Sequence, residues 1–156
     1  MRMQLAVAAA GVLMLSGCNA FTTTVTCIDY IDLSDHAVKA GVAELVFVGE
    51  VTGTDGVTEL SGVDAAAHTV RIDEVLKGEF SESEIRVVSV SDPCSGKDQD
   101  YPGGDPLDRT GPAEFFLVKN EGVWTTLSPY EGAVTIGDDG MLPWDPEATP
   151  SPSPVR

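Results

Sequence analysis

The sequence is poor in basic residues. Nine Lys and Arg residues stand against 25 Asp and Glu residues, so the formal net charge is -16. Nucleic-acid binding depends on basic side chains that release the counterions of the phosphates, and a field of this sign repels phosphates. We therefore expect no nucleic-acid partner, and no side-chain docking on an anionic membrane surface.

The sequence also lacks an apolar run long enough to span a membrane. A membrane-spanning helix needs about 20 apolar residues, whereas the apolar run at residues 5–15 stops well short of that length. Arg2 precedes this run and small residues follow it, which is typical of a secretory signal over residues 1–17. Residues 18–26 then form a short polar tether.

The end of this signal, "LSGC" at residues 15–18, resembles the lipobox of bacterial lipoproteins. In that family a diacylglyceryl group is attached to the cysteine thiol, and the signal is cut just before the cysteine. The resemblance implies that Cys18 is lipidated and becomes the first residue of the mature chain. Two acyl chains give stable anchoring. We therefore expect the protein at the cell membrane, lipid-anchored on the extracytoplasmic face.

Only three cysteines are present, and Cys18 is assigned to lipid, which leaves Cys27 and Cys94 as a pair. Disulfides form and persist outside the cytoplasmic membrane. A bridge between the two would close a loop of about 68 residues and stabilise the fold by about 4 kcal/mol. The alternatives are two free thiols, or one thiol that binds a metal. We favour the disulfide.

The remaining chain has the patterning of a β-protein. Residues 32–41 predict one short helix, with Asp32 or Ser34 as its N-cap and Gly41 at its end. The turn-rich run 53–64 is interpreted as a connection, and the alternation in residues 68–78 slips by one residue, which indicates a bulge of the kind that barrel closure demands. Strands are predicted at residues 44–52, 68–78, 84–91, 113–119, 122–127 and 132–136.

These elements predict an all-β fold, a five- to six-stranded OB-like barrel with one short helix, over residues 27–142. From residue 143 the chain is rich in proline, so residues 143–156 are expected to form a disordered tail.

Four stretches of this region resemble envelope proteins of Gram-positive bacteria that carry a netrin-like or tissue-inhibitor-of-metalloproteinases-like domain: "AELVFVGEVTG", "HTVRIDEVLKG", the Asp-Pro-Cys that ends at Cys94, and "EFFLVKNEGVW". The resemblance implies an OB-type five-stranded barrel with an N-terminal cysteine bridged to it. Inhibitors of that family chelate a protease zinc through a Cys-x-Cys N-terminus with a free α-amine. Here Ile28 and Asp29 follow Cys27, and its nitrogen is internal to the chain, so a protease inhibitor is a disfavoured alternative.

No catalytic motif stands out in the chain. No serine or cysteine lies in a recognisable nucleophile elbow, so neither His36 nor His68 has a nucleophile to activate. We therefore expect surface or capping roles for both histidines. No two carboxylates stand out as a glycosidase pair, and no CxxC spacing marks a metal site. We expect a protein that has no catalysis and no cofactor; a small envelope hydrolase or a metal-dependent enzyme is the alternative.

An acidic loop is the only candidate for a cation site. Four carboxylates surround two glycines within a stretch of 11 residues, and Ca²⁺ prefers such oxygen ligands. The loop lacks the Gly and Glu positions of an EF-hand, so a solvated loop is the favoured interpretation. The calcium candidates are Asp98, Asp100, Asp105 and Asp108.

Candidate ligand-binding aromatic residues are few. The second and third predicted strands carry no aromatic residue, and their basic residues are only Arg71, Lys77 and Arg86, which argues further against nucleic acid. Core or hairpin packing is the favoured interpretation of Trp124 and Tyr130, and the alternative is that they form the floor of a small carbohydrate or peptide groove. We expect a binding or interaction domain whose partner is an envelope protein or a glycan.

Overall fold

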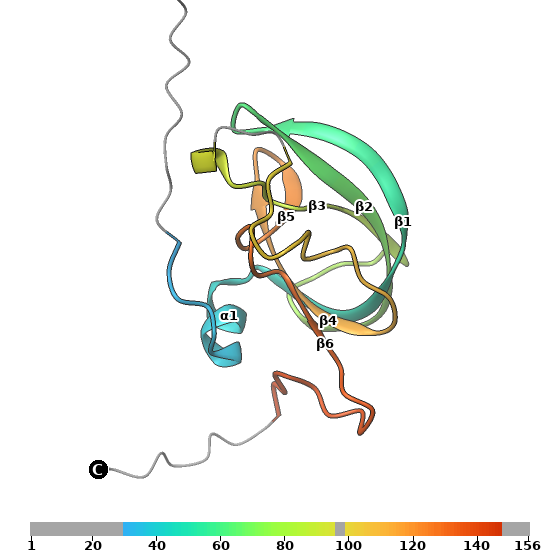
Figure 1. Ribbon diagram of the computed structural model, residues 1–156. Coiled ribbons are helices and arrows are strands. Elements are labelled where there is room, and N and C mark those ends of the chain that lie inside the picture. The colour runs from blue at the N-terminus through green and yellow to red at the C-terminus, as the bar shows by residue number, and fades with distance from the viewer. Residues whose placement is uncertain (1–29, 96–98, 148–156) are drawn as a thin grey trace, which may run out of the picture.

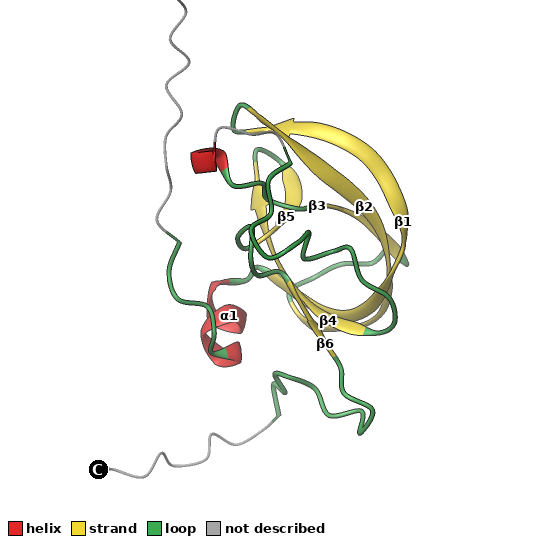
Figure 2. Cartoon of the chain, viewed as in Figure 1, coloured by secondary structure: helices red, strands yellow, loops and turns green. Residues whose placement is uncertain are grey.

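The structure is a computed structural model that describes residues 30–95 and 99–147 (Figure 1). The predicted signal and tether, with Cys18, Cys27 and Asp98, lie outside the described residues. Most of the regular structure is strand (Figure 2), which confirms the predicted all-β class. In chain order the elements are α1 (His36–Val42), β1 (Leu45–Leu60), β2 (Val63–Lys77), β3 (Glu84–Val88), the 3-10 turn η1 (Pro93–Ser95), β4 (Ala113–Asn120), β5 (Val123–Thr126) and β6 (Ala133–Thr135).

Five strands pair in a closed ring. β1 pairs antiparallel with both β2 and β4. β2 pairs antiparallel with β3, and β4 with β5. A parallel contact between β3 and β5 closes the ring, and β6 adds to β4 from outside it. This arrangement confirms the predicted all-β fold of five to six strands, with five of the strands closed into a ring.

The hairpin of β1 and β2 is longer than the sequence predicted. Its turn consists of residues 61–62, and both Ser61 (φ 53°) and Gly62 (φ 82°) adopt the left-handed conformation that a two-residue type I′ turn requires. The predicted connection over residues 53–64 is therefore wrong, except at residues 61–62, which form the turn; the other residues of this run belong to β1 and β2. The other glycines of that run lie within β1. Shifts in the register between β1 and β2 accommodate them, so the strand continues through these positions.

The bulge predicted in the second strand is present. The partner of Val48 is Glu74 and the partner of Gly49 is Ile72, so one residue of β2 is passed over at this step. The two strands also approach closely here, because a Cβ at Gly49 would clash with the Arg71 carbonyl oxygen. Such irregularities bend and twist a hairpin, which lets β1 pair with β2 and β4 at once.

The main core lies inside the ring. Phe47 and Phe115 stack there, with ring centroids 4.9 Å apart and an interplanar angle of 7°. Leu107, from the long loop after η1, is fully buried in the same cluster. That loop therefore crosses the ring and contributes to its core, as the gold trace in Figure 1 shows.

A second cluster covers the outer side of β1 and β4. Here α1 and the C-terminal segment pack against Val46 and Phe116. The helix begins at Asp35, whose Oδ1 accepts from the backbone N–H of Ala37 and Val38, and not at the predicted cap Asp32 or Ser34. Trp144 packs in this cluster as well. The packed domain therefore extends past the predicted boundary at residue 142.

Candidate functional site

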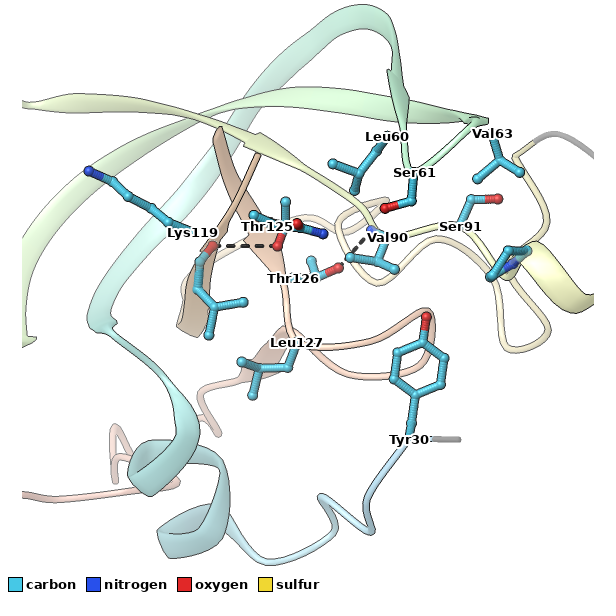
Figure 3. A pocket seen from close by; sticks show the side chains of 13 residues that line it. Tyr30, Leu60, Ser61, Val63, Val90, Ser91, Lys119, Thr125, Thr126 and Leu127 are labelled. Atoms are coloured by element: carbon cyan, nitrogen blue, oxygen red, sulfur yellow. Dashed lines mark hydrogen bonds between the residues drawn. The ribbon is translucent and has the colours of Figure 1, made fainter. Parts of the chain in front are cut away.

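A cavity of about 220 Å³ lies between the β1–β2 turn, the end of β4 and the segment that follows β3 (Figure 3). We call it the Tyr30 cavity. Most of its lining is apolar and comes from segments far apart in the chain, including Leu60, Val90, Val118 and Leu127. The turn chemistry of residues 61–62 positions this lining, because it ends β1 at Leu60 and starts β2 beside it.

Tyr30 forms one wall of the cavity. Its ring meets Tyr130 edge-on, with centroids 6.5 Å apart. Its hydroxyl oxygen points toward the side of Val90 and Ser91 in Figure 3, and it is buried without a hydrogen-bond partner among the described residues. Burial raises the pKa of the Tyr30 phenol, and Asp92 raises it further. The Tyr30 side chain is therefore a neutral phenol at physiological pH.

Other hydroxyl groups of the lining are engaged within the protein. Thr126 Oγ1 accepts from the Val90 N–H at 2.8 Å and donates to the Ser128 carbonyl at 3.1 Å. Ser91 Oγ accepts from the Asp100 N–H at 2.9 Å. These bonds fix the cavity wall, whereas the Tyr30 hydroxyl has no hydrogen-bond partner among the described residues.

A buried polar cluster fixes the long loop over the ring. Asp105 accepts from His68 Nε2 at 2.9 Å, from the Ser89 hydroxyl, and from the Leu107 N–H at 2.9 Å. Burial of Asp105 opposes its charged form, but the bonds from His68, Ser89 and Leu107 outweigh burial and lower its pKa. His68 is itself buried. The surface or capping role predicted for His68 is therefore wrong, because the loop covers it.

The order of groups in this cluster differs from that of a catalytic triad. In a triad the imidazole lies between the hydroxyl and the carboxylate. Here the Asp105 carboxylate lies between His68 and Ser89, with one oxygen bonded to each. The arrangement clamps the loop to β2 and to the chain after β3. His36 also connects two segments of the chain. Its Nδ1 donates to the Pro143 carbonyl at 2.9 Å, which joins α1 to the C-terminal segment.

The acidic loop shows no assembled cation site within the described ranges. No group of three or more His, Cys, Asp or Glu side chains that could hold a metal ion occurs among residues 30–95 and 99–147. The Asp105 carboxylate is bonded to His68 and Ser89, so it does not project into the loop with Asp100 and Asp108. Asp98 lies outside the described residues, so the solvated loop stays the prediction and calcium binding its alternative.

Trp124 and Tyr130 contact different aromatic residues. Trp124 meets Phe80 edge-on with centroids 6.4 Å apart, and the Lys119 ammonium lies 4.9 Å from its ring centroid. Tyr130 instead contacts Tyr30. Sequence reasoning missed Tyr30, although a large aromatic residue so close to the predicted bridge cysteine Cys27 was a usable signal.

The predicted disulfide partner Cys94 lies exposed on η1. Its neighbour Pro93 lines the same cavity as Tyr30. Cys27 precedes Tyr30 by three residues, which an extended chain spans in about 10 Å. The pairing of Cys27 with Cys94 stays a prediction, because Cys27 is outside the described residues.

Across the described part of the chain, no helix has the length and apolar character needed to cross a membrane. No protein-family model, curated protein or solved structure matches the chain.

Proposed function

We propose that the protein is a lipid-anchored, extracytoplasmic binding domain without catalysis, and that its ligand enters the Tyr30 cavity. The lipobox-like segment that ends at Cys18 supports the anchor. The observation that carries the binding role is the buried Tyr30 hydroxyl, which has no partner among residues 30–95 and 99–147. Buried polar groups are nearly always hydrogen-bonded, so this oxygen marks the place of a ligand atom.

The cavity defines the class of ligand. Its volume of about 220 Å³ is below that of sites for drug-sized molecules, which start at about 300 Å³. A single large apolar side chain fits this space, and an acceptor atom beside it would bond the Tyr30 hydroxyl. Such anchor residues, inserted into pockets, dominate the binding energy of protein interfaces. The partner is therefore an envelope protein that inserts one apolar residue.

The proposed anchor places the cavity near the membrane. Tyr30 follows Cys18 by 12 residues, which span at most about 40 Å when extended. A bridge from Cys27 to Cys94 would hold the N-terminal segment against the cavity rim. A membrane-bound partner is then within reach of the cavity.

The anchor is tested by metabolic labelling with palmitate and by cell fractionation. The natural chain is expected to incorporate the label and to stay in the membrane fraction. Cys18→Ala should do neither. Retention of Cys18→Ala in the membrane, or a natural chain that takes up no label, would refute the anchor.

The binding role is tested by photo-crosslinking in intact cells. A benzoylphenylalanine at Asn120, on the cavity lining, should capture a protein partner. The same group at Glu74, exposed toward the other end of β2, serves as the control and should capture none. Val63→Trp, which fills the cavity, should abolish the Asn120 adduct while the melting temperature is kept. Equal adducts at both positions, or an adduct that survives Val63→Trp, would contradict the proposal.

A further inference from the structure

A second hollow, of about 310 Å³, lies where the β2–β3 connection meets β3 and the start of β5. It shares no lining residue with the Tyr30 cavity. We call it the aromatic corner, because Phe80 and Trp124 both line it. Nothing in the proposed binding role uses it.

The two aromatic rings of the corner contact each other edge-on. Their planes meet at 76° with centroids 6.4 Å apart. Both side chains are half-buried and pack against the main core of the ring. A ligand would therefore meet a preformed angle of two aromatic surfaces, so little conformational entropy is lost on binding.

The charged groups around these rings are of both signs. Glu82 and Glu84 line the hollow, and both are exposed. Arg86 lines it as well, and its Nε is held by Asp55 at 2.6 Å. The Lys119 ammonium lies over Trp124. Although the chain as a whole is strongly acidic, this corner therefore offers hydrogen-bond acceptors and donors side by side.

We propose that the aromatic corner binds a neutral saccharide. A sugar ring has an apolar C–H face that packs on an aromatic side chain, and its hydroxyl groups both donate and accept hydrogen bonds. The carboxylates of Glu82 and Glu84 would accept from the hydroxyl groups, and the Arg86 guanidinium would donate to sugar oxygens. Glu82 and Glu84 would attract a cationic peptide, but such a peptide would leave the Arg86 donors without an acceptor, so the neutral saccharide uses more of the groups that line the hollow.

The experiment uses Trp124 as the reporter. In a Trp144→Phe chain, Trp124 is the remaining tryptophan, and its fluorescence is followed during titration with the neutral trimer of N-acetylglucosamine, with cellotriose, and with trilysine. We expect a saturable change with at least one of the two saccharides, with a Kd of about 1 mM or tighter. The matched control is Trp124→Phe, which keeps Trp144 and should show no change on titration.

Two further substitutions test the assigned contacts. Glu84→Gln keeps the shape of an exposed side chain and removes one charged acceptor, so binding should weaken about 3-fold to 10-fold. Phe80→Leu removes one ring and should weaken binding by about 10-fold, with circular dichroism melts to verify folding. The proposal is overturned if neither saccharide gives a saturable change, if both substitutions leave the Kd unchanged, or if only trilysine saturates the signal.

Discussion

Two buried side-chain oxygens in the described part of the chain have no hydrogen-bond partner, Tyr30 Oη and Glu114 Oε1, and their surroundings differ. The Tyr30 hydroxyl borders a cavity. Glu114 is fully buried on β4, and its other oxygen accepts from the Trp144 N–H at 2.8 Å. In the proposed binding role a ligand supplies the bond that the first oxygen lacks, whereas the second oxygen is enclosed by the protein's own C-terminal segment.

The carboxyl group of Glu114 can instead take up a proton. Burial raises its pKa to about 7, although the bond from Trp144 and the charge of Lys39 act in the opposite direction. Lys39 is itself buried and pairs with Glu131 at 2.6 Å. The unpartnered Tyr30 hydroxyl is the basis of the proposed ligand contact, while the unpartnered Glu114 carboxyl, under a covering segment, is a protonation site.

The N-terminal and C-terminal segments also differ in how they are attached to the rest of the fold. The first prediction, with the largest expected effect on the free energy of unfolding, tests this difference. The N-terminal segment is predicted to be held covalently through Cys27 and Cys94, whereas hydrogen bonds and packing hold the C-terminal segment. Cys94→Ser, in a soluble Cys18→Ala chain, should lower the free energy of unfolding by about 4 kcal/mol in urea titrations under oxidising conditions. After reduction the two chains should coincide. Equal stability of the two oxidised chains would contradict the bridge.

The second prediction concerns the pH dependence of the covered region. Because the pKa of Glu114 is about 7 in the folded state and 4.5 ordinarily, the folded protein binds this proton more tightly. The resulting stabilisation is complete below pH 4.5 and is lost as the pH rises to about 7. Glu114→Gln removes this loss, and above pH 7 it should be more stable than the natural chain by up to about 3 kcal/mol.

Thermal melts between pH 4.5 and 8 measure this difference. Glu74→Gln, at an exposed carboxyl, is the control and should leave the pH profile unchanged. A Glu114→Gln chain with the same profile as the natural one would show that Glu114 does not titrate in this range.

The third prediction tests whether the C-terminal segment is part of the fold. Trp144 is half-buried against the second cluster, so Trp144→Ala should lower the free energy of unfolding by about 2 kcal/mol, less than a fully buried tryptophan. It should also speed amide exchange in α1, which packs in the same cluster. Met141→Ala, at a side chain that is 70% exposed, is the control. An effect no larger than that of Met141→Ala would place the segment outside the cooperative fold.

The strands and the bulge could be predicted from the sequence because they depend on local alternation, as at Val70 and Ile72. The full length of β1 could not, since its glycines are accommodated by register shifts that depend on β2. The Asp105–His68 pair joins residues 37 positions apart, and no local pattern encodes such a contact. The burial of Glu114 could not be predicted from local sequence either. Its side chain lies on the outer side of β4, and it is buried only because α1 and the C-terminal segment cover that side.

The smallest expected change in stability is at Tyr30. If its hydroxyl has no partner in the unliganded protein, Tyr30→Phe should leave the free energy of unfolding unchanged or raise it by about 1 kcal/mol. Tyr101→Phe is the matched control, because the Tyr101 hydroxyl accepts from the Ala66 N–H at 2.8 Å and donates to the Ser89 carbonyl at 3.3 Å. Its loss should cost about 1–2 kcal/mol.

In the photo-crosslinking experiment we expect the opposite order, with the larger effect from Tyr30→Phe and the smaller from Tyr101→Phe. Tyr30→Phe removes the hydroxyl that the partner is proposed to use, so the photo-crosslinked adduct at Asn120 should decrease, whereas Tyr101→Phe should leave the adduct of the folded chain unchanged. If Tyr30→Phe instead destabilised the protein as much as Tyr101→Phe and left the adduct intact, the hydroxyl would be bonded within the protein. The cavity would then lose the polar contact on which the proposed binding role depends.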